Sequence, residues 1–157
     1  MMDVPESMKV ELAAWNDGAG IDLDSWVGCE GNFRLAIGYA SIFWPAFVEF
    51  EGLILRAGFG VDALRTFQRQ EGIDRASVES VMNHLHLDGI QYIGCPDASP
   101  DKLLHLGRVL EQIYAAKLQW QFPERPCLVS FHVPADQTDL AAYEITFWQL
   151  ANKGVPA

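Results

Sequence analysis

The sequence predicts an α+β fold that is predominantly helical, with about five helices, two of them long, and a C-terminal antiparallel β-hairpin packed on the helices. Two observations carry this prediction. Apolar residues recur at helical spacing through residues 31–56 and again through residues 99–123, and the period changes to strict alternation after residue 126. The chain has 157 residues, half of them hydrophobic and a fifth charged, so we expect one globular domain spanning residues 1–157.

The longest apolar-rich stretch, residues 31–56, is interpreted as a helix. On a wheel of about 100° per residue its large apolar side chains share one face. Its small, polar and helix-breaking residues share another: Arg34, Gly38, Ser41, Pro45, Glu49, Gly52 and Arg56. Pro45 lies on this second stripe, so we expect a kink or a break there. The uncharged run from Leu35 to Val48 has 14 residues, fewer than the roughly 20 that a membrane span requires, which favours a buried core helix.

Shorter elements flank this segment. Residues 5–16 fit a short helix and residues 18–30 a loop that carries Trp26. A helix is expected from Val61 to Gly72, and the next, N-capped by Asp74, is expected to close at Gly89. A short strand over residues 90–93 precedes a long helix from Ser99-Pro100 to Pro123, which we expect to pack antiparallel to the central helix.

The C-terminal part has the two-residue period of half-buried strands. The residues that share the predicted inner face are Cys127, Val129, Phe131, Val133, Tyr143, Ile145 and Phe147, and those that share the outer face are Leu128, Ser130, His132, Glu144, Thr146 and Trp148. A lone hairpin is marginal in water, so this one is expected to lie on the helices.

The net charge of −10 is concentrated near the N-terminus. Residues 1–30 contain seven acidic residues and one lysine, and so carry −6 of the total. Such a field repels nucleic-acid backbones and anionic membranes and attracts a basic partner, so we expect no nucleic-acid and no membrane binding. The candidate binding residues are Asp17, Asp22, Asp24 and Glu30, together with Trp148 on the outer strand face. The other four tryptophans are expected mostly in the core.

The three cysteines, Cys29, Cys95 and Cys127, are widely spaced and form no CxxC pair, and the first residues lack the layout of a signal peptide. Both features favour a cytoplasmic protein with free thiols. No phosphate-binding glycine loop or nucleophile elbow is present, and we expect no cofactor.

The string His84-Leu85-His86-Leu87-Asp88-Gly89 resembles the HxHxDH zinc motif of metallo-β-lactamase-fold hydrolases. It departs from that motif at the last position, where Gly89 replaces a ligand histidine. On the expected helix, His84 and His86 would point about 160° apart and would be unable to share a metal. The sequence therefore predicts no metal site.

Three residues are weak candidates for acid–base chemistry. On the helical wheel Glu51 falls inside the apolar arc, where burial would raise the pKa of its carboxyl; the simpler alternative is an edge carboxylate that extends to solvent or pairs with an arginine. His132 is expected to face Glu144 or Thr146 across the hairpin, either as a structural pair or as an acid–base pair with Glu144.

The function favoured by charge, size and the missing catalytic motifs is a non-enzymatic, immunity- or adaptor-like protein that binds a basic partner through acidic and aromatic surface. The alternative is a small enzyme or ligand-binding domain with a pocket between the long helices and the hairpin, tested at Glu51, His132 and Glu144. A third interpretation is self-assembly through the small-residue stripe of residues 31–56. The sequence leaves open whether the protein is an enzyme and what its oligomeric state is.

Overall fold

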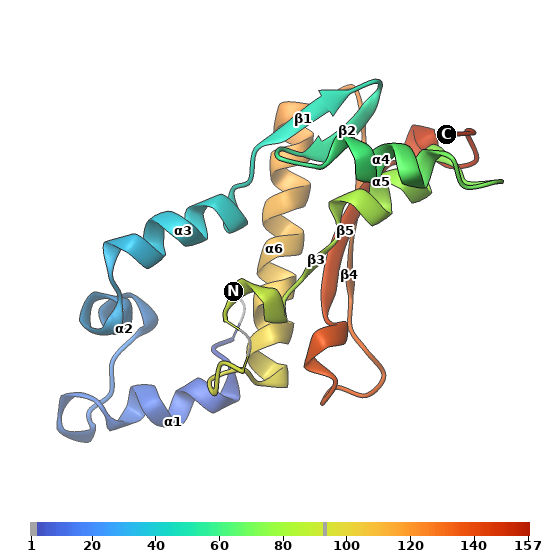
Figure 1. Ribbon diagram of the computed structural model, residues 1–157. Helices are drawn as coiled ribbons and strands as arrows, with labels where there is room; N and C mark the ends of the chain where they lie inside the picture. Colours follow the sequence, from blue (N-terminus) through green and yellow to red (C-terminus); the bar gives the residue numbers. More distant parts are fainter. Residues whose placement is uncertain (1–2, 93) are drawn as a thin grey trace.

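The computed structural model describes residues 3–92 and 94–157, and these residues form an α+β structure with six α-helices and small antiparallel sheets (Figure 1). The helices are α1 (Glu6–Ala14), α2 (Leu23–Glu30), α3 (Phe33–Phe43), α4 (Val61–Gln68), α5 (Arg75–Asn83) and α6 (Pro100–Gln121). The strands are β1 (Phe47–Phe50), β2 (Leu53–Arg56), β3 (Leu85–His86), β4 (Cys127–His132) and β5 (Glu144–Gln149). Single 3₁₀ turns lie at Asn16–Gly18, Asp88–Ile90, Leu140–Ala142 and Leu150–Asn152.

The prediction of one helix through residues 31–56 is wrong, because the segment is a helix followed by a hairpin. α3 ends at Phe43, and β1 pairs with β2 in an antiparallel register that places Phe50 opposite Leu53. Pro45 supplies no N–H and disfavours helical geometry at the residue before it. Glu51 and Gly52 both have positive φ, 52° and 79°, which is the geometry of a two-residue hairpin turn. The small-residue stripe that suggested self-assembly therefore does not exist.

The C-terminal hairpin is confirmed. β4 and β5 pair antiparallel along their whole length, from Cys127 opposite Gln149 to His132 opposite Glu144. The alternation is as expected, since Tyr143, Ile145 and Phe147 are buried on the inner face. β3, which the sequence did not reveal, pairs with the start of β5 and completes a sheet of strand order β3-β5-β4.

α6 is the one long helix of the described residues, and the inner face of this sheet packs against it; the prediction of two long antiparallel helices is wrong. The contact is closest at Gly107, where a Cβ atom would lie 2.1 Å from the ring of Phe131. The core side chains around this contact include Leu103, Leu110, Tyr114, Leu118, Tyr143, Ile145 and Phe147.

Polar side chains of α5 join the β1–β2 hairpin to the larger sheet. The buried Glu79 carboxylate accepts hydrogen bonds from the backbone N–H of Ile54 in β2 and of Gln149 in β5, both at 2.8 Å. Asn83, also fully buried, donates to the carbonyl oxygens of Ile54 and Phe147. The unpaired edges of two strands are thus satisfied by side chains rather than by another strand.

Among the other helices and strands expected from the sequence, some are confirmed and some are wrong. The short helix over residues 5–16 is confirmed as α1, the helix after Val61 as α4, and the Pro100 helix as α6. Residues 18–30 do not form only a loop, because Asp22 caps α2 by accepting from the Ser25 N–H at 2.8 Å. α5 ends at Asn83, well before Gly89, and the strand expected at residues 90–93 is absent from the described part, residues 90–92. Residue 93 lies outside the described residues.

The chain divides into two regions of different packing. Residues 3–44, here called the arm, contain α1, α2 and α3; residues 45–157, here called the body, contain the sheets, α4, α5 and α6. In Figure 1 the arm leaves the body near the lower end of α6, runs outward, and returns to β1 near the upper end. In the arm only Pro5 and Leu12 are buried. All other buried residues of the described chain lie in the body. No helix in the described part of the chain is long and apolar enough to cross a membrane.

Candidate interaction site

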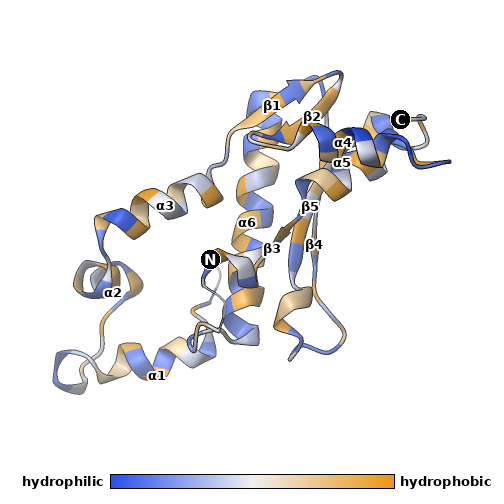
Figure 2. Cartoon of the chain, viewed as in Figure 1, coloured by the Kyte–Doolittle hydropathy of each residue, from blue (hydrophilic) through white to orange (hydrophobic). Residues whose placement is uncertain are grey.

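α3 is apolar and yet exposed. None of its 11 residues is buried, and the exposed fractions of Phe33, Leu35 and Ile37 are 89%, 51% and 74%. Figure 2 shows the apolar colouring of α3 in the part of the chain that stands away from the sheets. Single exposed apolar residues are ordinary, but a helix with several of them marks a contact surface.

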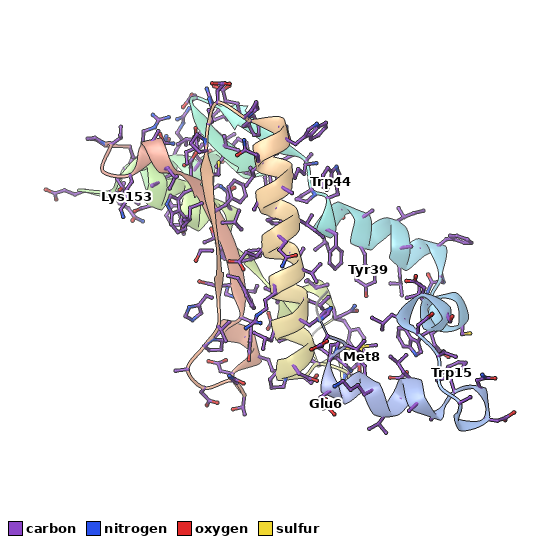
Figure 3. All side chains as sticks on the ribbon, turned by 180° about the vertical axis from the view of Figure 1, so that it is seen from behind. Glu6, Met8, Trp15, Tyr39, Trp44 and Lys153 are labelled. Atoms are coloured by element: carbon purple, nitrogen blue, oxygen red, sulfur yellow. The ribbon has the colours of Figure 1, made fainter. Side chains whose placement is uncertain are left out.

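Two cavities lie along α3 and meet at Tyr39. The first, about 680 Å³, lies in the bend between α2 and α3 and is lined by Trp26, Val27, Leu35 and Tyr39 among others. The second, about 530 Å³, lies between α3, α6 and the segment after β3, and its walls include Tyr39, Phe43, Leu87, Ile90, Leu103 and Leu106. Figure 3 shows Tyr39 projecting from α3 into the space between the arm and α6. We call the two adjoining cavities the α3 groove.

The charged side chains that line the α3 groove are mostly acidic. Glu30 lines the first cavity, and Asp88, Asp97 and Lys102 line the second. The ammonium of Lys102 is already paired with the Asp97 carboxylate. The groove therefore presents an apolar floor with an excess of carboxylates around it.

The predicted acidic binding residues lie together on the arm. Asp22, Asp24 and Glu30 are exposed residues at the start, in the first turn and at the end of α2, and Asp17 lies in the turn before it with φ of 55°. Hydrogen bonds from Ser25 hold the pKa of the Asp22 carboxyl below its usual range. The arm thus combines the acidic surface with the exposed apolar helix.

Trp148 lies on a different surface. Its half-buried side chain is on the outer face of β5, opposite Leu128, whereas α6 covers the inner face and separates the sheet from the arm. The expectation that the other four tryptophans are mostly core is wrong, since none is buried. Trp44 and Trp120 are 52% and 72% exposed, with ring centroids 6.2 Å apart, at the junction of arm and body. The Lys117 ammonium lies 4.5 Å from the Trp44 ring, a cation–π contact.

Glu51 is not a buried acid. It is an exposed residue of the β1–β2 turn whose carboxylate pairs with Arg65 through bonds of 2.6 and 2.7 Å. These bonds lower the pKa of the Glu51 carboxyl, so the hypothesis of a raised pKa is wrong and the arginine-paired alternative is correct.

Glu144 has a histidine on each side across the sheet. His132 of β4 and His86 of β3 are both directly opposite Glu144, and the His86 Nε2 lies 4.0 Å from the Glu144 carboxylate. Gln149, at the other end of β5, donates to the carbonyl of Gly52 beside Glu51. Since β5 spans about 17 Å, Glu51 and Glu144 lie at opposite ends of the strand and share no site.

The prediction that His84 and His86 lie on one helix is wrong. His84 follows the end of α5, His86 lies in β3, and their ring centroids are 5.2 Å apart. Both line a shallow depression of about 540 Å³ beside α5, together with Glu144 and Trp148. Within residues 3–92 and 94–157, no three His, Cys, Asp or Glu side chains are arranged to hold a metal ion.

Sequence reasoning missed the residues that form the α3 groove. Tyr39 and Phe43 are among the large apolar side chains of residues 31–56 that share one face of the helical wheel, a position that predicts burial in the core and not the wall of a cavity. Leu103 and Leu106 belong to the apolar residues that recur at helical spacing through residues 99–123, but that spacing does not indicate that they line a cavity as well as packing on the core.

Comparisons with known proteins add no family to this description. The chain matches no protein-family model, and neither a similar curated protein nor a similar solved structure was found.

Proposed function

We propose that the protein is a non-enzymatic cytoplasmic binding module, immunity- or adaptor-like, whose arm takes up a basic protein partner. The observation that carries the proposal is the exposure of α3, an apolar helix that has no buried residue and touches the core only through the half-buried Ile42 and Phe43. The acidic residues of α2 stand beside it, and residues 1–30 carry −6. Acidic surface next to apolar surface suits a partner that is basic and partly apolar.

The alternative, an acid–base or ligand-binding pocket, has weaker support. The three candidates divide between two places, since Glu51 pairs with Arg65 while His132 faces Glu144 at the far end of β5. The flanking of Glu144 by His132 and His86 favours a small polar site on the outer sheet face. This site is open and shallow, which gives little exclusion of water from a reacting group.

The test is capture of the partner from a lysate of the source organism, followed by elution in a salt gradient and intact-mass analysis. We expect a stoichiometric basic protein released by moderate salt. The double variant Asp24→Lys with Glu30→Lys should reduce capture at least tenfold. The control, Asp62→Lys with Glu71→Lys, makes the same charge change at exposed positions outside the arm and should leave capture unchanged. An equal loss of partner capture in both double variants, or capture that does not depend on salt concentration, would contradict the proposal.

A further inference from the structure

The α3 groove has the dimensions of a helix-binding site. Its two cavities adjoin at Tyr39 and extend beside α3, which is about 16 Å long. A helix of this length presents three or four large side chains on one face, at spacings of three and four residues. Cavities of about 680 and 530 Å³ have room for side chains of that size.

The backbone around the groove also argues for a helical occupant. α2 and α3 line most of the first cavity, α3 and α6 line part of the second, and residues 87–92 and 94–98 form most of the remaining wall; the internal residues of the three helices use their backbone N–H and C=O groups within the helix. An extended segment laid against these helices would find few backbone partners, so its own polar groups would be buried unpaired. A helix satisfies its own backbone and offers only side chains.

The charge of the groove selects the partner. Glu30, Asp88 and Asp97 line it against one cation, Lys102, which is paired with Asp97. A second copy of this chain is a poor match, because residues 31–157 carry a net charge of −4 and none of the six described helices exceeds a net charge of +1. An anionic membrane surface would be repelled by the same carboxylates.

We propose that the α3 groove binds an amphipathic α-helix of a basic protein, with the apolar face of that helix in the two cavities around Tyr39 and its lysine or arginine side chains against Glu30 and Asp88. This inference rests on the proposed function and specifies its binding mode. The partner helix would close the face of α3 that the free protein leaves open.

The experiment places a photo-crosslinking residue, p-benzoylphenylalanine, at position 39 in cells of the source organism, with the same residue at position 148 as the matched control on the other surface. Both positions hold partly exposed aromatic side chains. We expect crosslinks from position 39 to a segment with apolar residues every three or four positions and with lysine or arginine between them. Position 148 should give none.

The captured segment is then made as a synthetic peptide, and its affinity is measured by fluorescence anisotropy. Leu35→Asp should weaken binding at least tenfold. Val61→Asp should leave it unchanged, since Val61 is about as exposed but lies on α4. Equal binding to both variants would overturn the groove as the site.

The outcomes separate this inference from the proposed function. A crosslink from position 39 to a second copy of this chain would overturn the inference. Partner capture that is reduced by Asp24→Lys with Glu30→Lys, without a crosslink from position 39, would overturn the inference and leave the proposed function standing. A basic partner crosslinked only from position 148, or crosslinks only to acidic proteins, would overturn both.

Discussion

The arm and the body use apolar residues in opposite ways. In the body, apolar residues of β2, α5, α6 and β5 fill two core clusters and are almost fully buried. In the arm, the apolar helix α3 has no buried residue, and the only buried residues are Pro5 and Leu12. The body therefore has a hydrophobic core that stabilises its fold. The arm carries apolar surface that its own chain does not cover, as expected of a region that functions by contact with another molecule.

The comparison predicts that the largest losses of stability come from the polar core of the body. Glu79→Ala removes the acceptor of the Ile54 and Gln149 N–H groups and leaves them buried without partners. We expect the free energy of unfolding to fall by about 3–5 kcal/mol, measured by urea denaturation. Asp62→Ala, an exposed acid on α4, is the control and should change it by less than about 0.5 kcal/mol. A small effect at Glu79 would mean that Asn83 and apolar packing suffice to join the two sheets.

The close approach of β4 to α6 gives the next effect. Gly107→Ala places a methyl group against the Phe131 ring, and the strand or helix has to move. Overpacking of this kind costs about 1–3 kcal/mol. The same change in a Phe131→Leu background should cost less, because the smaller side chain leaves room. Equal costs in both backgrounds would show that the clash is relieved elsewhere.

The C-terminal part of the body, from α6 onward, was the most predictable region. The alternation of β4 and β5 and the outward position of Trp148 follow from the two-residue period, and the limits of α6 follow from Pro100 at its start and Pro123 after its end. Those signals work where one face is buried and the other is not. The same alternation placed His132 on one face with Glu144 and Thr146, and the structure pairs it with Glu144.

The prediction failed where local turn chemistry competed with apolar period. Residues 47–56 fit a helical wheel, but Pro45 and the Glu51-Gly52 turn specify a hairpin, and this error carried Glu51 from a turn into a supposed core. The α3 groove was out of reach for another reason. An apolar helix predicts burial, and nothing in its period tells whether the covering surface comes from the same chain or from a partner.

The attachment of the arm to the body gives a smaller effect that depends on pH. The Asp101 carboxylate accepts bonds from the Ser99 hydroxyl at 2.6 Å and from the Ser7 N–H in α1 at 2.8 Å, and these bonds hold the pKa of Asp101 well below its usual range. A carboxyl whose pKa is lowered by folding stabilises the protein above about pH 4, and the stabilisation is lost as the pH falls below that value. Asp101→Asn should cost about 1 kcal/mol at pH 7 and flatten the acid limb of the stability profile.

Limited proteolysis shows whether this bond holds the arm. Asp101→Asn should speed cleavage within α1, because the Ser7 contact is weakened. Asp136→Asn is the control; hydrogen bonds from Thr138 also lower the pKa of Asp136, but it lies in the loop between β4 and β5. Cleavage of α1 at an unchanged rate in Asp101→Asn would mean that other contacts fasten the arm.

The smallest effect on stability is the most direct test of the difference between the two regions. Ile37→Ala and Ile54→Ala remove the same atoms, one from an exposed site on α3 and one from the core beside Glu79. Ile54→Ala should cost about 2–5 kcal/mol, and Ile37→Ala less than about 0.5 kcal/mol, by urea denaturation of dilute protein. A cost above about 1 kcal/mol at Ile37 would mean that α3 is covered in the free protein. If that cost increases with protein concentration, the covering molecule is a second copy of this chain. A negligible cost, combined with weaker capture of the partner, would show that the apolar surface of α3 acts in binding and contributes nothing to folding.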